Sequence, residues 1–396
     1  MPVEPLFPLG AELLARDEIG LLRARQQVGS SFGGRIVLEG REYINFSSND
    51  YLGASGQESI KAAWQQGITD WGCGSGASPL VTGYTKAHAE LEESLADWLG
   101  VEAVLLFSTG FAANQAVIKA LLSSKHQQWQ DKLNHASLQE AGAISPARLR
   151  RFKHNDMTHL AALLCPQSGL VISEGVFSMD GDQAPCQELL ALTRDSGNWL
   201  MIDDAHGFGV HGTQGRGTLD LQGVAPSDIQ IVIGTFGKAF GTAGAFMAGS
   251  RQLIDYMVNF ARDYVYSTHM PPSQAVASLA ALRWVQQADE ERKHLQVLVQ
   301  QFRNGAAALG LRLMPSMTAI QPILIGDSHV AMEVATRLRE SGYWVTAIRP
   351  PTVPSGLARI RITLTAAHSH EDVCSLLEGF AGIIGQWPEA GCGCDA

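Results

Sequence analysis

The stretch Trp199-Leu-Met-Ile-Asp-Asp-Ala-His-Gly207 joins a short apolar run directly to two carboxylates and an imidazole. Short apolar runs bounded by turn residues are typical of buried strands, and several more occur before and after this one. We predict strands at Ala103–Phe107, Leu149–Phe152, Gly169–Ser173, Trp199–Ile202 and Ile229–Gly234, with helices at Phe111–Leu122, Asp156–Leu164 and Cys186–Arg194. This alternation predicts an α/β fold, in which a large, mostly parallel sheet is covered by helices on both faces.

On either side of this region the pattern changes. Residues 11–28 and Lys86–Leu99 read as helices and Tyr43–Ser47 as a strand, whereas the polar segment Ser123–Gln130 is assigned to no element. Towards the C-terminus we predict helices at 273–288, 290–309 and 370–385, and strands at 318–325, 343–348 and 358–363. We therefore divide the chain into an N-terminal helical segment (1–45), a large domain (46–290) and a small C-terminal α+β domain (291–396).

Composition narrows the class of protein. The chain has 396 residues, of which 45% are hydrophobic and 17% charged, and this favours a globular protein with a large core. Its net charge of -10 argues against nucleic acid or an anionic membrane as a main partner. No apolar stretch reaches the ~20 residues that cross a bilayer, and Met1–Gly10 lacks the pattern of a secretory signal.

The cysteines point to a reducing compartment. Six are scattered through the chain, as expected of reduced thiols in a cytoplasmic protein. Cys392 and Cys394 share the C-terminal tail, but two thiols alone make a poor metal site. We expect no metal.

Polar residues follow the predicted strands, where active sites of open parallel sheets lie. In Ser108-Thr-Gly-Phe111, Gly110 permits a tight turn, and the free N–H groups of the helix start can hold a phosphate. Asp203 and His206 can face one ligand. Either stretch could instead be a structural turn. For the second stretch, a metal site made by Asp203, Asp204 and His206 is a further alternative.

Two further stretches carry reactive side chains. Lys238 lies among glycines in Gly234-Thr-Phe-Gly-Lys-Ala-Phe-Gly241, and a buried lysine with a lowered pKa is nucleophilic towards an aldehyde. The same residue could instead be an exposed loop lysine. Asn134-His-Ala-Ser137 offers an imidazole, or else a capping asparagine and a core histidine.

Taken together, these stretches match what one cofactor needs. Pyridoxal phosphate requires N–H donors for its phosphate, an acidic partner for its ring nitrogen and a lysine for its aldehyde. An anion-binding helix start, Asp203 with His206, and Lys238 supply these groups in order along the chain. A nicotinamide enzyme is disfavoured because no G-x-G-x-x-G follows an early strand.

From about Leu21 to Leu377 the chain resembles the α-oxoamine synthase family of fold-type-I pyridoxal-phosphate enzymes. The resemblance rests on Asn45-Phe-Ser-Ser-Asn-Asp-Tyr-Leu-Gly53, Ser108-Thr-Gly-Phe-Ala-Ala-Asn-Gln115, Asn134-His-Ala-Ser-Leu138, Glu174-Gly-Val-Phe-Ser-Met-Asp-Gly181, Asp203-Asp-Ala-His-Gly207, Thr235-Phe-Gly-Lys238 and Ala347-Ile-Arg-Pro-Pro-Thr-Val-Pro354. The last stretch is nearer to members that condense L-alanine with a pimeloyl thioester, carried by coenzyme A or acyl carrier protein, in biotin biosynthesis.

The resemblance implies a role for each matching residue. Lys238 would carry the cofactor as a Schiff base and move protons, Asp203 would pair with the ring nitrogen, and His206 would bond the phenolic oxygen. The remaining cofactor contacts would come from the N–H groups of Gly110 and Phe111, the Thr235 hydroxyl, Ser178 and the stacked His135, and from Ser267 and Thr268 of the neighbouring subunit of a homodimer.

The substrate residues implied by the resemblance form a second set. Arg361 would bind the amino-acid carboxylate near Asn49, His135 would polarise the thioester carbonyl, and Arg23 and Thr352 would line the acyl site. Sister activities that use glycine or serine with another acyl-CoA, such as a 2-amino-3-ketobutyrate CoA ligase, remain open. The sequence also leaves room for aldol cleavage, for transamination and for a binding module without enzymatic activity.

Overall fold

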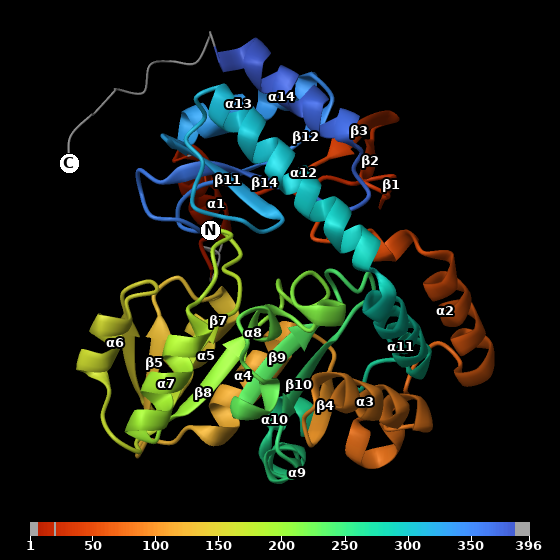
Figure 1. The fold of residues 1–396 in the computed structure, drawn as a ribbon, viewed down its shortest axis with the longest axis vertical. Coiled ribbons are helices and arrows are strands. Elements are labelled where there is room, and N and C mark those ends of the chain that lie inside the picture. Colours follow the sequence, from red (N-terminus) through yellow and green to blue (C-terminus); the bar gives the residue numbers. More distant parts are fainter. Residues whose placement is uncertain (1–6, 20, 385–396) are drawn as a thin grey trace, which may run out of the picture.

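The computed structural model describes residues 7–19 and 21–384, which form two lobes (Figure 1). The lower lobe is built on a seven-stranded sheet of order β4-β10-β9-β8-β7-β5-β6. Its strands are β4 (Ala103–Phe107), β5 (Gln127–Asp131), β6 (Arg148–Phe152), β7 (Gly169–Glu174), β8 (Trp199–Asp203), β9 (Ile231–Thr235) and β10 (Ala245–Gly249). β10 runs antiparallel to both of its neighbours, and the other six strands all run in the same direction. The predicted α/β class and mostly parallel sheet are confirmed.

Helices cover both faces of this sheet, since alternate strand residues pack into two separate cores. One core joins Leu105, Ile172 and Ile233 to α4 (Gly110–Leu121), α5 (Ala136–Ile144), α9 (Arg251–Phe260) and α10 (Arg262–Val265). The other joins Leu106, Val171 and Val232 to α3 (Lys86–Leu99), α6 (Met157–Leu163), α7 (Cys186–Ser196), α8 (Thr218–Leu221) and α11 (Pro272–Gln287). This two-sided burial explains the continuous apolar runs of the strands.

The sequence analysis left two strands unassigned. β5 reads as polar, yet Gln128 and Gln130 are fully buried and donate to the backbone carbonyls of Gly142 and Leu138 in α5. A buried amide that finds such partners is tolerated inside a sheet. β10 fills the gap between β4 and β9, with Ala245 paired to both Phe107 and Thr235.

The upper lobe contains two smaller sheets. β11 (Ile320–Gly326), β14 (Ala358–Thr363) and β13 (Thr346–Ile348) form an antiparallel sheet, and β1 (Ser30–Phe32), β2 (Arg35–Leu38), β3 (Arg41–Asn45) and β12 (Tyr343–Trp344) form the other. The helices of this lobe are α1 (Leu9–Glu18), α12 (Asp289–Ala308), α13 (Ser328–Glu340) and α14 (His370–Ile384). The prediction of a helical segment over 1–45 was therefore wrong for residues 30–45, which form strands, and the helix expected over 11–28 ends at Glu18.

The misassignment has a physical reason. β1 to β3 pair antiparallel with one another across the turns Gly33-Gly34 and Glu39-Gly40, whose positive φ angles exclude a helix here. β3 also pairs in parallel with β12, some 300 positions later in the sequence. The domain boundaries after residues 45 and 290 stay predictions. At the second boundary, Ala288 separates α11 from α12, which continues into the upper lobe (Figure 1).

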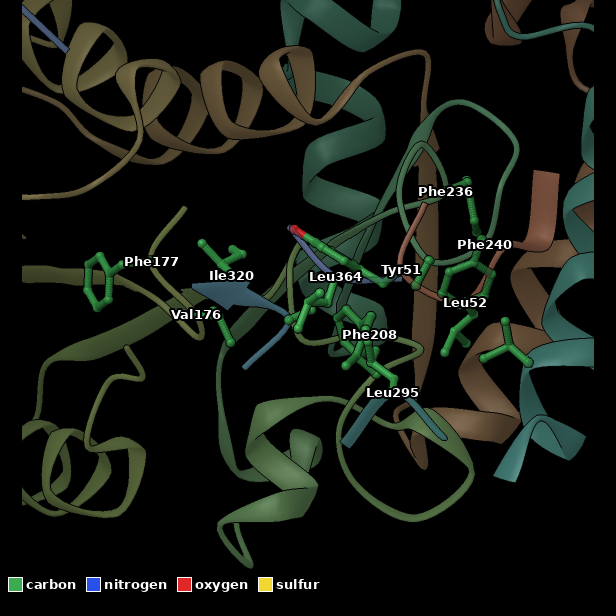
Figure 2. Packing of buried hydrophobic residues seen from close by; sticks show 14 of the residues in the cluster. Tyr51, Leu52, Val176, Phe177, Phe208, Phe236, Phe240, Leu295, Ile320 and Leu364 are labelled. Carbon is green, nitrogen blue, oxygen red and sulfur yellow. The ribbon is translucent and has the colours of Figure 1, made fainter. Parts of the chain in front are cut away.

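The remaining elements are one longer helix and several short helical turns. They are α2 (Glu58–Trp71) and the short helical turns Ala54–Gly56, Pro79–Gly83, Thr213–Gly215 and Pro226–Asp228. One hydrophobic cluster runs from the large sheet into the upper lobe, and Figure 2 shows Tyr51, Phe208 and Val176 of the lower part near Ile320 and Leu364 of the upper part. Among the described helices, none combines the length and hydropathy needed to cross a bilayer.

Candidate active site

The carboxyl ends of three neighbouring strands bring polar side chains to one edge of the sheet. Asp203 ends β8 and pairs in register with Glu174, which ends β7, while Thr235 ends β9 on the other side. Asp203 and Glu174 are 7% and 3% exposed, respectively. Two adjacent buried carboxyl groups repel as anions, and burial together with the charge of Asp203 raises the pKa of Glu174 well above its usual range. Glu174 is therefore the member of this pair that is pushed towards its protonated form.

Lys238 lies in the loop after β9, half-buried and close to this pair. Burial lowers the pKa of its ammonium group, and the nearby charges of Asp203 and Glu174 oppose that shift. The interpretation of Lys238 as an exposed loop lysine is therefore wrong. The glycines around it serve packing: the rings of Phe246 and Phe208 occupy the place of a side chain at Gly234, and Gly241, at φ +66°, lies against the backbone of Ser55.

A hydrogen-bond chain joins Asp203 to His135. The Asn114 amide donates to Asp203 Oδ2 at 2.7 Å and to Ser137 Oγ at 2.9 Å. Ser137 Oγ lies 2.8 Å from His135 Nδ1, and the Ser137 N–H also donates to that nitrogen. Because Nδ1 accepts, the neutral imidazole carries its proton on Nε2. The chain fixes both the Asp203 carboxylate and the tautomer of His135.

Asn114 and Ser137 are residues that sequence reasoning missed. Asn114 follows Gly110 by four positions in α4, so both lie on one helix face, a signal that was present in the sequence. His135 is the N-cap of α5 and is exposed, whereas Asn134 is buried and donates to the Ile172 carbonyl. The alternative of a capping asparagine and a core histidine is therefore wrong: His135 is the cap, and Asn134 is the buried residue.

We expect Asn114→Ala to lower the kcat/KM of the enzyme about ten- to a hundredfold. The estimate follows from the ~1.5–3 kcal/mol that a hydrogen bond to a charged group contributes. Steady-state kinetics would measure the loss, and circular dichroism would check the fold. Unchanged kcat/KM in a folded variant would show that Asp203 needs no support from α4.

Tyr51, in the Asn45–Gly53 stretch, holds His206. Its Nδ1 lies 2.6 Å from the Tyr51 hydroxyl, which also contacts Asn49 Oδ1 at 3.3 Å. Burial lowers the pKa of His206 well below its usual value, with the charges of Lys238 and Arg361 acting in the same direction. His206 is therefore a neutral imidazole held at Nδ1 by the Tyr51 hydroxyl. Tyr51 was not singled out in the sequence because it lies 155 positions away.

Arg361 of β14 reaches the site from the upper lobe. Its guanidinium donates to the Ser178 carbonyl at 2.8 Å, to Thr363 Oγ1 at 2.7 Å and to Asn49 Oδ1 at 3.2 Å. It is 7% exposed and its charge acts on Lys238 and His206. The structure thus brings Arg361, Asn49 and Ser178 together beside Lys238.

The start of α4 is an open anion-binding position. Gly110 has no atom within 4 Å of where a side chain would begin, and Phe111 is exposed. Thr109 caps the helix by accepting from the Ala112 N–H. The Thr235 hydroxyl donates to the Gly244 carbonyl at 2.9 Å, so it must turn to contact a phosphate.

Four of the predicted residues lie away from this cluster. Ser267 and Thr268 are exposed between α10 and α11, where no described contact joins them to Lys238. Arg23 and Thr352 line a separate cavity of about 350 Å³, shared with Arg16, Leu21 and residues 347–351. This cavity contains the additional cations Arg16 and Arg349, which sequence reasoning missed.

The residues at the strand edge fit pyridoxal phosphate. A half-buried amine of lowered pKa, a buried carboxylate with a fixed orientation and an open helix start provide the three groups that the cofactor needs. Metal chemistry has no matching geometry, since Asp204 turns away to accept from Thr218. Within residues 7–19 and 21–384, no group of three or more His, Cys, Asp or Glu side chains is arranged to hold a metal ion.

Comparisons with known proteins agree with this arrangement. The model of the family "Aminotransferase class I and II" matches residues 41–380. An 8-amino-7-oxononanoate synthase of Aeromonas salmonicida is 59% identical over 385 residues, covering 97% of each chain. A serine palmitoyltransferase from S. paucimobilis, solved with a bound PLP–myriocin adduct, has a TM-score of 0.88 at 27% identity, covering 94% of this chain and 96% of that one. The crystal structure of an 8-amino-7-oxononanoate synthase from Francisella tularensis has a TM-score of 0.78 at 28% identity, covering 87% and 98%.

Proposed function

This chain belongs to the aminotransferase class I and II family, and we propose that it condenses L-alanine with a pimeloyl thioester. The products are 8-amino-7-oxononanoate, CO2 and a free thiol, and the pathway is biotin biosynthesis. The enzyme is a pyridoxal-phosphate-dependent acyltransferase. The observation that carries the proposal is that the charges of both Asp203 and Arg361 act on the amine of Lys238.

When bound, pyridoxal phosphate supplies an aldehyde that condenses with amines and a protonated ring that accepts the electron pair left at Cα. Asp203 would keep the ring nitrogen protonated, and the helix start at Gly110 and Phe111 would hold the phosphate. His206 would bond the phenolic oxygen, and Ser178, Thr235 and His135 would line the cofactor. A neutral His206 suits this role because it adds no positive charge beside Lys238.

Lys238 moves the protons of the reaction. Its lowered pKa lets the free amine take the proton from Cα of L-alanine, whose carboxylate is held by Arg361 and Asn49. The Nε2–H of His135 donates a hydrogen bond to the thioester carbonyl while Cα bonds to the carbonyl carbon and the C–S bond breaks. The sulfur leaves as a thiolate, which takes a proton from solvent. The carboxylate then leaves as CO2, and Lys238 returns the proton to Cα.

The cavity around Arg23 and Thr352 is our proposed acyl site. Arg16, Arg23 and Arg349 give it a positive charge against a net charge of -10 for the whole chain. A cationic cavity suits the distal carboxylate of a pimeloyl chain or the phosphates of its carrier.

We expect Arg23→Gln to raise the KM for the acyl thioester about tenfold, as loss of one charge-assisted contact implies. The KM for L-alanine should stay within about twofold, because Arg361 and Asn49 lie in the other cluster. Initial rates at varied concentrations of each substrate would separate these effects. An equal rise in both KM values would place Arg23 outside the acyl site.

A homodimer and a cytoplasmic location complete the proposal. Ser267 and Thr268 are exposed, as residues that complete the phosphate site of a second copy must be in an isolated chain. The described cysteines Cys73, Cys165, Cys186 and Cys374 are free thiols, which suits a reducing compartment.

Carboxyl-labelled L-alanine tests the reaction type. Labelled CO2 should appear only when pimeloyl-CoA or the pimeloyl carrier protein is also present. Transamination would leave the label in pyruvate, and aldol cleavage would need no thioester. Release from labelled glycine or serine in preference to alanine would replace the proposal by a sister α-oxoamine synthase activity.

A further inference from the structure

An imidazole bridges two carboxylates just outside the reacting groups. His154, in the loop after β6, contacts Asp131 Oδ1 through Nδ1 at 3.0 Å and Asp182 Oδ2 through Nε2 at 2.7 Å. Asn155 reinforces both contacts, since its N–H donates to Asp131 Oδ2 and its amide donates to Asp182 Oδ2. No residue of this cluster takes part in the reaction described above.

Each carboxylate belongs to a loop that carries a site residue. Asp131 ends β5 and accepts the Leu133 N–H at 2.8 Å, which shapes the turn leading to His135. Asp182 lies in the loop after β7, where backbone hydrogen bonds of Phe177 with Asp182 and Gly181 close a turn around Ser178. The His154 ring also packs edge-on against Phe177, with centroids 4.5 Å apart.

The second loop leads directly to the amino-acid carboxylate site. The Ser178 carbonyl accepts from Arg361 Nε, and Asp180 accepts from Arg359 at 2.7 Å. The Gly181 carbonyl accepts from Ser316 and Thr318 of the upper lobe. A shift of this loop would therefore move Arg361 relative to Lys238.

We propose that Asp131, His154 and Asp182 form an ionic clamp that sets the spacing between His135 and the Ser178–Arg361 pair. His154 is thus a positioning residue for the amino-acid substrate. The inference rests on the proposed function for its substrate, but the clamp itself is a property of this chain.

A clamp of this kind works only while the imidazole is positively charged. Burial disfavours that charge, but hydrogen bonds and attraction to Asp131 and Asp182 outweigh it and raise the pKa of His154 to about 10. Asp180 also faces this group, with its charge countered by Arg359 of β14. Because the folded pKa is raised, the clamp contributes fully below the unfolded value of about 6.5. The contribution is lost as pH rises through about 10.

The first test needs no cofactor. Nitrogen-15 NMR of histidine-labelled, cofactor-free protein should show one ring with both nitrogens protonated at about pH 8.5, where an ordinary histidine is neutral. The signal should be absent from His154→Gln. In Asp182→Asn, which keeps the side-chain shape, the same ring should titrate at a lower pH.

The second test uses the holoenzyme. His154→Gln and Asp182→Asn should each raise the KM for L-alanine about tenfold, since a small misplacement of Arg361 weakens its binding of the substrate carboxylate. The KM for the acyl thioester should change little. The double variant should raise the KM for L-alanine no more than either single variant does, because both substitutions break the same contact. His126→Gln, an exposed histidine bonded only to Ser123, is the matched control.

Two results would overturn the clamp: a neutral His154 at about pH 8.5, or an unchanged KM for L-alanine in both variants. Failure of the proposed function would look different. In that case the wild-type protein would consume no alanine, while the NMR result would still decide whether the clamp exists.

Discussion

Lys238→Ala should lower thiol release by on the order of 10⁴-fold or more, because the same amine holds the cofactor and moves the Cα proton. Burial lowers the pKa of Lys238, so its amine is neutral often enough to remove a proton. The variant should still fold, since no hydrogen bond described in the structure depends on its Nζ. Stopped-flow measurement of thiol release with both substrates would give the rate.

Lys61→Ala is a suitable control, since Lys61 is a surface residue of α2 paired with Glu58. It should keep the wild-type rate within about twofold. Substantial turnover by Lys238→Ala would remove this residue from the reaction. The fold of the variant would be verified by thermal unfolding, so that an inactive but unfolded protein is not counted as support.

Asp203→Asn should lower kcat by roughly a thousandfold, comparable to the loss of one preorganised electrostatic contact at a reacting group. A neutral amide cannot keep the cofactor ring nitrogen protonated, and Asn114 would face an amide in place of a carboxylate. The KM for the acyl thioester should change little, because its proposed cavity lies elsewhere. Steady-state kinetics with varied substrates would separate kcat from KM.

The neighbouring acid is a matched control. Asp204 is fully buried, and both its oxygens accept hydrogen bonds from Thr218. Asp204→Asn should therefore lower the unfolding temperature while kcat falls less than tenfold. If both variants lost activity equally, the charge of Asp203 would have no special role.

The fold was largely predictable from sequence because its central strands are buried on both faces. That environment selects continuous apolar runs, such as those of β4, β7 and β8, and these stand out without an alignment. β5 was missed because Gln128 and Gln130 look solvated until the carbonyls of α5 are known. β1 and β2 were missed although they pair locally, because strands of three and four residues are too short to show a clear apolar alternation, whereas the strand predicted at Tyr43–Ser47 overlaps β3.

The candidate site, like the fold, could be predicted only in part. Lys238, Asp203 and His206 follow strands, so their convergence could be predicted from topology alone. The contact of His206 with Tyr51 could not be predicted, since the two residues are 155 positions apart, and Arg361 was predicted only through the family resemblance. Phe208, which directly follows the Asp203–Gly207 stretch, is 1% exposed and packs on Phe246 in the core.

The most direct test records the visible spectrum of the purified protein while a thiol reagent follows the reaction with L-alanine and pimeloyl-CoA. A yellow protein that releases thiol only when both substrates are present is the predicted result. A carrier-protein thioester would be tried in parallel, since the cavity suits either carrier. A protein that stays colourless after addition of pyridoxal phosphate, and releases no thiol from either thioester, would contradict the account.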